Sequence, residues 1–133
     1  MNTKDIGDVS VGKIIGRLVK EGRTILLPFG DNARYDLVLD DQGIFTRVQC
    51  KTGHPIGNAI HFKTVSTNYK KGSWVLKNYV GDVDVFAVYC PETDEVFMVP
   101  MSVIENRNSL SLRLCPPLRP NGKRMVYAKD FVI

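Results

Sequence analysis

The chain has 133 residues, of which 44% are hydrophobic and 24% are charged, and its net charge at pH 7 is +4. This length and this apolar fraction predict one compact domain with its own core rather than two domains. No apolar run is long enough to cross a bilayer, so we expect no membrane partner. The positive charge alone is weak evidence for a polyanionic partner, because many soluble domains are mildly basic.

The ends of the chain and its cysteines narrow the class of protein further. The N-terminal residues lack the basic and then apolar order of a signal peptide, so we expect a cytoplasmic protein. Cys50, Cys90 and Cys115 are odd in number and far apart, which indicates neither a disulfide framework nor a CxxC metal site. Cys50 and Cys90 stand among strand-forming residues and are expected in the core. The chain ends at Ile133 on apolar residues, and we expect more chain to follow in the natural protein.

The first predicted element is an amphipathic helix over residues 5–21. Either Asp8 or Ser10 is expected to cap its start. Lys13 and Arg17 fall on its outer face. Its inner face carries apolar residues at three- and four-residue spacing, namely Val11, Ile14, Ile15, Leu18 and Val19.

Short strands follow the predicted helix. In chain order we expect them at 24–28, 35–39, 44–50, 59–65, 83–90 and 95–100. Residues 52–58 are expected to form a loop, and the polar segment 66–78 is expected to be irregular. A short helix is expected at 102–106, and the remainder is expected to be loop with short strands. This order predicts an α/β or α+β fold around a mixed sheet.

The strands at 35–39 and 44–50 form a hairpin that brings three reactive side chains together. Asp36 lies on the first strand, and the period of two puts Gln49 and Lys51 on one face of the second. A carboxylate and an amide oxygen can hold a divalent metal against a phosphate, and an ammonium group can assist the attacking water. Taken alone, each of these side chains is more often part of an ordinary strand surface. Together they favour a metal-dependent nuclease.

The residues around this hairpin carry a resemblance to a known family. The segments concerned are 27–38, 47–53, 79–81 and 85–93. They resemble the PD-(D/E)XK nuclease superfamily, and within it the branch of cyanobacterial group I intron homing endonucleases. The resemblance covers most of residues 5–104. It implies a single endonuclease domain over 1–133 with a restriction-endonuclease-like core, in which helices flank a mixed β-sheet.

The resemblance also implies roles for particular residues. Asp36, Gln49 and the backbone carbonyl of Cys50 would bind Mg²⁺, with Mn²⁺ as an alternative and Ca²⁺ as a non-catalytic substitute. Lys51 would orient or deprotonate the attacking water, or neutralise the phosphate. Gln49 stands where the superfamily usually has an acid, and Val11 stands where this branch usually has a glutamate. Val11 can be a core residue. If a glutamate belongs at this position, the chain has lost one metal-assisting carboxylate and is expected to be a weakened nuclease that still binds DNA.

The resemblance implies double-stranded DNA with a long pseudo-palindromic target as the partner. A subunit with one site cuts one strand, so we expect a homodimer or homotetramer. DNA-contacting strands and loops are expected at about 58–80, before a C-terminal extension at about 105–133. Trp74 fits the core, a stacked base or a subunit contact equally well. The candidate DNA-binding residues are Arg34, Arg47, His61, Lys63, Ser66, Asn68, Lys70, Lys71, Trp74 and Lys77.

Three other functions fit part of the pattern. A Holliday-junction resolvase or a restriction-type nuclease of the same fold would share the chemistry of Asp36, Gln49 and Lys51. A DNA-binding module without catalysis is favoured by Val11 and by the neutral Gln49. A ribosomal or RNA-associated β domain is suggested only by the basic composition, and it does not explain why Asp36 and Lys51 are paired.

Overall fold

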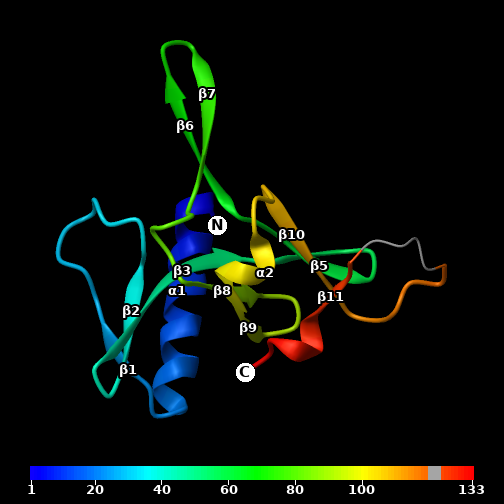
Figure 1. Cartoon of the computed structure of the whole chain (residues 1–133), viewed down its shortest axis with the longest axis horizontal. Helices are drawn as coiled ribbons and strands as arrows, with labels where there is room; N and C mark the ends of the chain where they lie inside the picture. The colour runs from blue at the N-terminus through cyan, green and yellow to red at the C-terminus, as the bar shows by residue number, and fades with distance from the viewer. Residues whose placement is uncertain (120–123) are drawn as a thin grey trace.

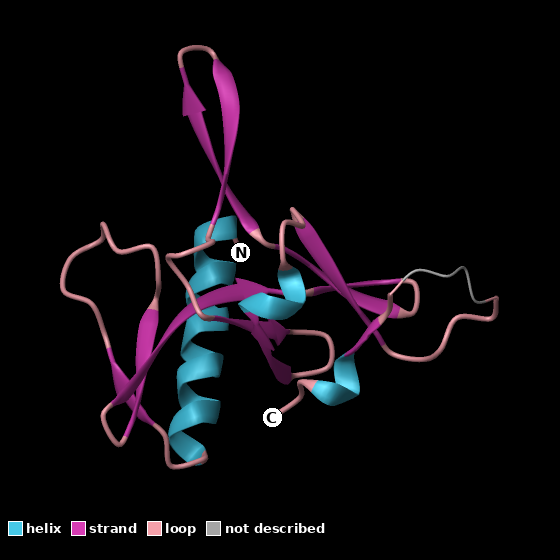
Figure 2. Cartoon of the chain, viewed as in Figure 1, coloured by secondary structure: helices cyan, strands magenta, loops and turns pink. Residues whose placement is uncertain are grey.

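One long helix and a run of short strands make up the chain (Figures 1 and 2). The structure is a computed structural model, and it describes residues 1–119 and 124–133. The helical elements are α1 (Thr3–Lys20), α2 (Met101–Ile104) and the 3-10 turn η1 (Ala128–Asp130). The strands are β1 (Thr24–Leu26), β2 (Leu37–Asp41), β3 (Ile44–Thr52), β4 (His54–Ile56), β5 (Ala59–Lys63), β6 (Val65–Lys70), β7 (Ser73–Asn78), β8 (Val85–Cys90), β9 (Glu95–Pro100), β10 (Ser109–Arg113) and β11 (Val126–Tyr127).

The main sheet has five strands in the order β1-β2-β3-β8-β9. Strands β3 and β8 pair in parallel, whereas the other neighbours pair antiparallel, so the sheet is mixed. Helix α1 packs on one face of this sheet. The expected mixed α+β fold with a restriction-endonuclease-like core is confirmed.

Helix α1 begins earlier than the sequence pattern predicted. Asn2 is the capping residue, and its side-chain oxygen accepts a hydrogen bond of 2.9 Å from the N–H of Asp5. The expectation that Asp8 or Ser10 caps the helix is therefore wrong. The apolar periodicity starts only at Val11, but an asparagine cap can begin a helix in polar sequence. Gly22, with φ +81°, follows the helix end.

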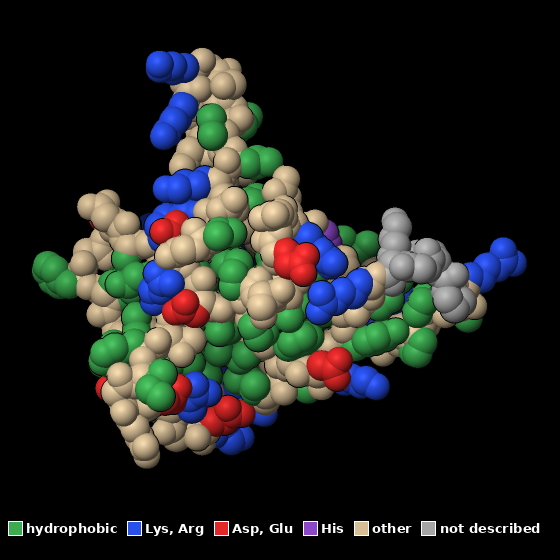
Figure 3. Space-filling view, viewed as in Figure 1, with side chains coloured by type: hydrophobic (Ala, Val, Ile, Leu, Met, Phe, Trp, Pro, Cys, Tyr) green, Lys and Arg blue, Asp and Glu red, His purple; other side chains and the backbone are tan. Residues whose placement is uncertain are grey.

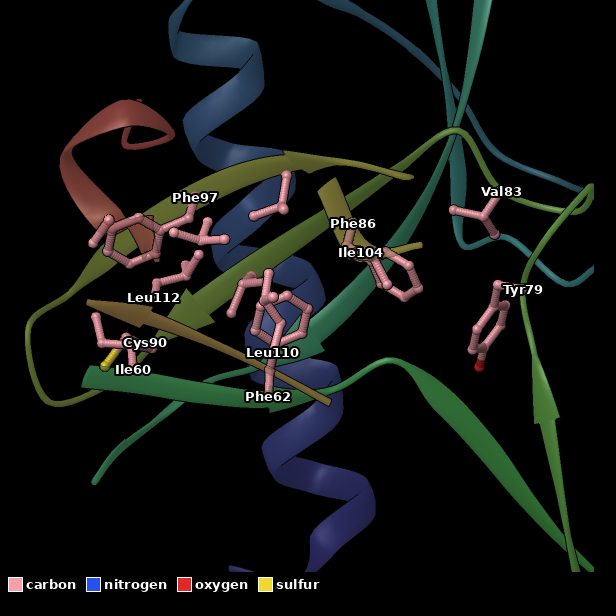
Figure 4. Packing of buried hydrophobic residues seen from close by; sticks show 14 residues of the cluster. Ile60, Phe62, Tyr79, Val83, Phe86, Cys90, Phe97, Ile104, Leu110 and Leu112 are labelled. Atoms are coloured by element: carbon pink, nitrogen blue, oxygen red, sulfur yellow. The ribbon is translucent and has the colours of Figure 1, made fainter. Parts of the chain in front are cut away.

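The alternation along β3 divides its side chains between the two faces of the sheet, as predicted. Val48 and Cys50 are buried beneath α1 in a cluster that includes Ile14 and Leu18. Gln49 and Lys51 are half-buried on the opposite face. A second cluster covers that opposite face, and Figure 4 shows its side chains.

The C-terminal segment is part of this second cluster. Strand β10 pairs with β5 in a sheet of order β11-β10-β5-β4. Leu110 and Leu112 of β10 pack with Phe62 and Phe97, and Val126 joins them (Figure 4). The segment at 105–133 therefore builds the core of the same domain. Residues 120–123 of this expected extension lie outside the described part of the chain.

Two segments expected to be irregular are strands. Within 52–58, residues His54–Ile56 form β4 against β5. Residues 66–78 form most of the β6–β7 hairpin, which projects from the body of the molecule (Figure 1). Its strands are almost wholly exposed, so the half-buried pattern that marks most strands is missing from the sequence. Among the described residues, no helix is long and apolar enough to cross a membrane.

Candidate active site

Asp36 lies just before β2 and forms hydrogen bonds with β3 through both its backbone and its side chain. Its N–H donates a 2.9 Å hydrogen bond to the carbonyl of Val48. Its Oδ2 accepts a 2.8 Å hydrogen bond from the N–H of Cys50. The sequence analysis put Asp36 within the strand, whereas β2 begins one residue later, at Leu37. The carboxylate is therefore held at the start of β2, beside Cys50 near the C-terminal end of β3.

The electrostatics of Asp36 combine opposing effects. Burial raises the pKa of this carboxyl group, whereas the hydrogen bond from Cys50 and the charge of Lys51 lower it. The net shift is upward, because burial is the largest effect. A cation bound at the carboxylate would favour its ionised form.

Lys51 is half-buried close to Asp36 and to an aromatic ring. Its Nζ lies 5.0 Å from the ring centre of Tyr79. Burial is the main cause that lowers the pKa of Lys51, and the charges of Arg34 and Lys63 lower it further, while Asp36 opposes the shift. Lys51 therefore releases a proton more readily than an exposed lysine, which suits proton transfer to or from a water.

Gln49 points to the same side of β3 as Lys51. Its Nε2 lies 3.5 Å from the hydroxyl of Tyr79, which is the long limit of a hydrogen bond. A glutamine that presents its amide nitrogen to a tyrosine leaves its amide oxygen for another partner.

The donor set fits a divalent cation that prefers oxygen. Asp36 offers a carboxylate, and Gln49 offers a neutral amide oxygen. The N–H of Cys50 points at Asp36 rather than at β8, and the carbonyl of a strand residue points to the same side as its N–H. This carbonyl is therefore directed toward Asp36 as well. The described residues contain no group of three His, Cys, Asp or Glu side chains that could hold a metal, so any ion here depends on neutral oxygens and water.

Val11 lies on the flank of α1 that is turned away from β9. On the other flank, Lys13 lies 3.7 Å from Asp94 in the β8–β9 turn, and Arg17 lines the same groove. Residues 11 and 13 are 200° apart around a helix, so Val11 faces away from β9. It is half-buried and packs against the cluster beneath α1. That cluster includes Leu37 and Cys50, which are next to Asp36 and Lys51 in the sequence.

The two arginines predicted to touch DNA near the site are engaged within the protein. The guanidinium of Arg47 donates to both carboxylate oxygens of Asp84, at 3.1 and 3.0 Å, and to the carbonyl of Gly81 at 2.8 Å. Arg34 donates to Ser66 Oγ at 2.9 Å and to the carbonyl of Asn78 at 2.6 Å. Both side chains hold the segment that connects the projecting hairpin to β8. Their role at DNA stays a prediction.

Comparison with known families agrees with this site. The model of the PD-(D/E)XK endonuclease family matches residues 1–133. This chain belongs to the PD-(D/E)XK endonuclease family. Members of this family generally use divalent metals, which is consistent with the donor set of Asp36, Gln49 and the Cys50 carbonyl.

A solved structure with the same fold gives a second comparison. The PD-(D/E)XK endonuclease described here superimposes on the bacterial homing endonuclease I-Ssp6803I with a TM-score of 0.79 and 26% sequence identity. The match covers 99% of this chain and 89% of that chain. A comparison with curated protein sequences finds no match.

The β6–β7 hairpin of this PD-(D/E)XK endonuclease has two different faces. Cross-strand partners share a face, and the pairs Tyr69↔Trp74 and Thr67↔Leu76 form one face that is mostly apolar. Tyr69 and Trp74 make an edge-to-face contact with ring centres 5.3 Å apart. Trp74 is 71% exposed, so it is not a core residue. The opposite face is mostly polar and is formed by Ser66↔Lys77, Asn68↔Val75 and Lys70↔Ser73.

The remaining candidate DNA-binding residues are spread over the surface near the hairpin. In Figure 3, lysine and arginine side chains gather along one side of the projecting hairpin. Lys71 occupies the turn with φ +49°. Lys63 is exposed on β5 and close enough to Lys51 to lower its pKa. His61 lies farther along β5, where Nδ1 is 3.1 Å from Ser111 Oγ.

Sequence reasoning missed two residues that shape this site. Tyr79 contacts Lys51, Gln49 and Arg34, yet it lies in a connection and has no fixed spacing from the hairpin of Asp36. Asp84 holds Arg47 from the residue before β8. For Tyr79 the sequence offered one signal, because residues 79–81 belong to a segment that carries the family resemblance, but this signal assigned the tyrosine no role.

Proposed function

We propose that this PD-(D/E)XK endonuclease is a site-specific double-strand DNA endonuclease of the intron-homing type, and that it hydrolyses phosphodiester bonds with Mg²⁺. The observation that carries the proposal is that Asp36, just before β2, and Lys51, on β3, are close enough to influence each other's pKa in a chain of this family. The likeness to a bacterial homing endonuclease over nearly the whole chain supports the homing assignment.

The residues of the site divide the chemistry between them. Asp36, Gln49 and the Cys50 carbonyl would hold the ion, which when bound acidifies water and neutralises charge on the phosphate. Asp36 stays in place because the Cys50 N–H binds its Oδ2. Lys51, with its lowered pKa, takes a proton from the attacking water or donates a hydrogen bond to the phosphate.

The polar face of the β6–β7 hairpin suits the major groove of duplex DNA. A two-stranded ribbon fits that groove, and amide and hydroxyl groups can read base edges there. Ser66, Asn68 and Lys70 are on this face with Lys77. Its lysines would contact phosphates, which position the protein without reading sequence.

A homodimer or homotetramer would follow from this function. One site cuts one strand, and two copies related by a twofold axis would cut both strands of a pseudo-palindromic target. Light scattering after size exclusion, with and without target DNA, measures the assembly. A stable monomer on DNA would contradict this part of the proposal.

Strand cleavage tests the catalytic part of the proposal. Wild type should nick supercoiled plasmid with Mg²⁺ and not with EDTA, and Lys51→Ala should reduce the rate by about 100-fold or more. Binding of target DNA in Ca²⁺ should be retained by this variant. Lys20→Ala is the matched control, because Lys20 is exposed in the last turn of α1. Equal nicking by wild type and Lys51→Ala would overturn the assignment.

Substrate choice tests the homing part. Cleavage of intron-insertion sequences should exceed cleavage of four-way junctions and of scrambled duplexes of equal length. Preference for the junction would indicate a resolvase of the same fold, and cutting at short sites would indicate a restriction-type nuclease.

A catalytically weakened DNA-binding protein is the second candidate function. It is favoured by the apolar Val11 of α1 and by the neutral Gln49. It is also favoured because the described residues contain no group of three His, Cys, Asp or Glu side chains that could hold a metal. In this case target DNA would bind with Ca²⁺, while Mg²⁺-dependent nicking would be at background.

A further inference from the structure

Tyr79 lies between two cations of the site. It is only 5% exposed and lies in the connection between β7 and β8, at one end of the cluster in Figure 4. The guanidinium carbon of Arg34 is 4.1 Å from the centre of its ring, and Nζ of Lys51 is 5.0 Å from it. Both distances are within the roughly 6 Å over which a cation is attracted to an aromatic ring. Both cations are therefore within reach of the same ring.

The ring of Tyr79 is itself fixed by its surroundings. It makes an edge-to-face contact with Phe86 of β8, with ring centres 5.5 Å apart and an interplanar angle of 88°. The carbonyl of Tyr79 accepts hydrogen bonds from the N–H groups of Asp82 and Val83, at 3.0 and 3.1 Å. Its hydroxyl lies 3.5 Å from Nε2 of Gln49. A ring in this position limits where the side chains of Lys51 and Gln49 can lie.

Arg34 connects Tyr79 to the base of the projecting hairpin. It donates to the hydroxyl of Ser66 on β6 and to the carbonyl of Asn78 at the end of β7. Its Nε is buried 3.5 Å from the carboxylate of Asp82, in a geometry that does not form a hydrogen bond. One guanidinium thus joins both strands of the hairpin to the face of Tyr79. A tilt of the hairpin would move Arg34 and, through the ring, Lys51.

We propose that Tyr79 is a positioning residue for Lys51 and Gln49, and that Arg34 couples it to the β6–β7 hairpin, so that docking of the hairpin on DNA sets the position of the lysine. This proposal rests on the nuclease function proposed above and adds to it a coupling between binding and catalysis. A displacement of about 1 Å at a reacting group can cost about 100-fold in rate, so such a contact is large enough to control cleavage.

Kinetics of two tyrosine variants test the positioning role. Tyr79→Leu should lower kcat by about 10- to 100-fold, with KM and DNA affinity within about threefold of wild type. Tyr79→Phe keeps the ring and should recover most of the lost kcat. Tyr89→Leu is the matched control, since Tyr89 is also 5% exposed but packs in the cluster beneath α1. If Tyr79→Leu lowers kcat no more than Tyr89→Leu does, the proposal is wrong.

A spectroscopic measurement separates this proposal from the nuclease function itself. The ε-methylene protons of Lys51, assigned by comparison with Lys51→Arg, should show an upfield ring-current shift in wild type. The shift should vanish in Tyr79→Leu and persist in Tyr79→Phe and Tyr89→Leu. If the protein cuts no DNA but shows this pattern of shifts, the nuclease function is refuted and the contact between Lys51 and Tyr79 is supported. An unshifted signal in wild type would refute the contact.

Arg34→Gln tests the coupling to the hairpin. If Arg34 positions Tyr79, this variant should lower kcat and move the Lys51 signal, while the salt dependence of DNA binding stays unchanged. If Arg34 instead binds a phosphate, the slope of log affinity against log salt should fall by about 0.9, with the Lys51 signal unmoved. Arg23→Gln is the control, because Arg23 pairs with Asp41 at 2.8 Å, on the strand pair β1–β2. The second outcome would overturn the coupling.

Discussion

The side-chain hydroxyls of Ser10 on α1 and Thr52 on β3 lie 2.5 Å apart, although 42 residues separate them in the sequence. Ser10 is 1% exposed, and a buried hydroxyl without a partner would be costly. The bond therefore favours one register of α1 against the end of β3. The position next to it, Val11, is fixed by the same bond relative to Cys50 and Asp36.

Val11→Glu should raise Mg²⁺-dependent cleavage. Val11 packs against the cluster that contains Leu37 and Cys50, the neighbours of Asp36 and Lys51, so we expect a carboxylate here to add a charged oxygen to the donor set of Asp36, Gln49 and the Cys50 carbonyl. We expect an increase of about tenfold or more in the rate at limiting Mg²⁺, since each 1.4 kcal/mol of added stabilisation is tenfold. Nicking of target DNA over a range of Mg²⁺ concentrations measures it.

Two controls accompany the substitution at position 11. Val9→Glu makes the same change on an exposed part of α1, where Val9 is 41% exposed, and should leave the rate unchanged. Val11→Gln supplies an uncharged oxygen of the same length and should give a smaller increase. If Val11→Glu cuts no faster than Val9→Glu, the register deduced for α1 is wrong.

Asp36→Asn should stabilise the metal-free protein while abolishing cleavage. Burial raises the pKa of Asp36 above its value in the unfolded chain, so the stability linked to this group is complete below about pH 4 and is lost as the pH rises through the raised pKa. At neutral pH the buried ionised carboxylate therefore lowers the free energy of unfolding, and a neutral amide in its place has no such cost. Its side-chain oxygen can still accept from the Cys50 N–H.

Thermal unfolding in EDTA checks this prediction. The Tm of Asp36→Asn should exceed that of wild type at pH 7, and the difference should shrink toward pH 4 and below. Asp31→Asn, in an exposed loop, should show neither effect. A lower Tm for Asp36→Asn at neutral pH would mean that the carboxylate is stabilised by contacts other than the Cys50 N–H.

The part of the site that could be predicted from the sequence is the part that lies on one strand. A period of two is enough to put Gln49 and Lys51 on one face of β3 and Cys50 on the other. The apolar run at 83–90 likewise predicted a strand, and Val85–Cys90 is β8, which pairs with β3 and β9. Such local patterns arise because one or both faces of a strand are buried, and the strands of the main sheet have buried faces.

Contacts between connections could not be predicted in this way. Residues 66–78 have no buried face, so nothing in their pattern distinguishes the β6–β7 hairpin from a polar loop. Arg34 and Arg47 look like free cations in the sequence, because their partners Ser66 and Asp84 are more than 30 residues away. Only the folded chain shows that these arginines hold the segment before β8.

Asp84→Asn should destabilise the protein at neutral pH. The hydrogen bond from Arg47 lowers the pKa of Asp84, so the stability linked to this carboxylate is present above about pH 4 and is lost as the pH falls through the lowered pKa. Both side chains are partly exposed, so we expect a loss of about 1–4 °C in Tm at pH 7. Asp8→Asn, on the exposed face of α1, is the control. Equal Tm values for wild type and Asp84→Asn would show that the Arg47–Asp84 pair does not stabilise the protein.

The lysines at the end of the β6–β7 hairpin should govern the salt dependence of DNA binding. Lys70 lies on the polar face and Lys71 in the turn, and both are exposed. Each phosphate contact contributes about 0.9 to the slope of log affinity against log salt, so Lys70→Ala combined with Lys71→Ala should reduce the slope by up to about 1.8. Fluorescence anisotropy with target and scrambled duplexes measures both slopes. The double variant should weaken binding of the two duplexes equally, since phosphate contacts carry no sequence information.

Lys4→Ala with Lys20→Ala removes the same charge from α1 and should leave the slope unchanged. If the hairpin variant and the α1 variant have the same slope, the hairpin is not the DNA-binding element.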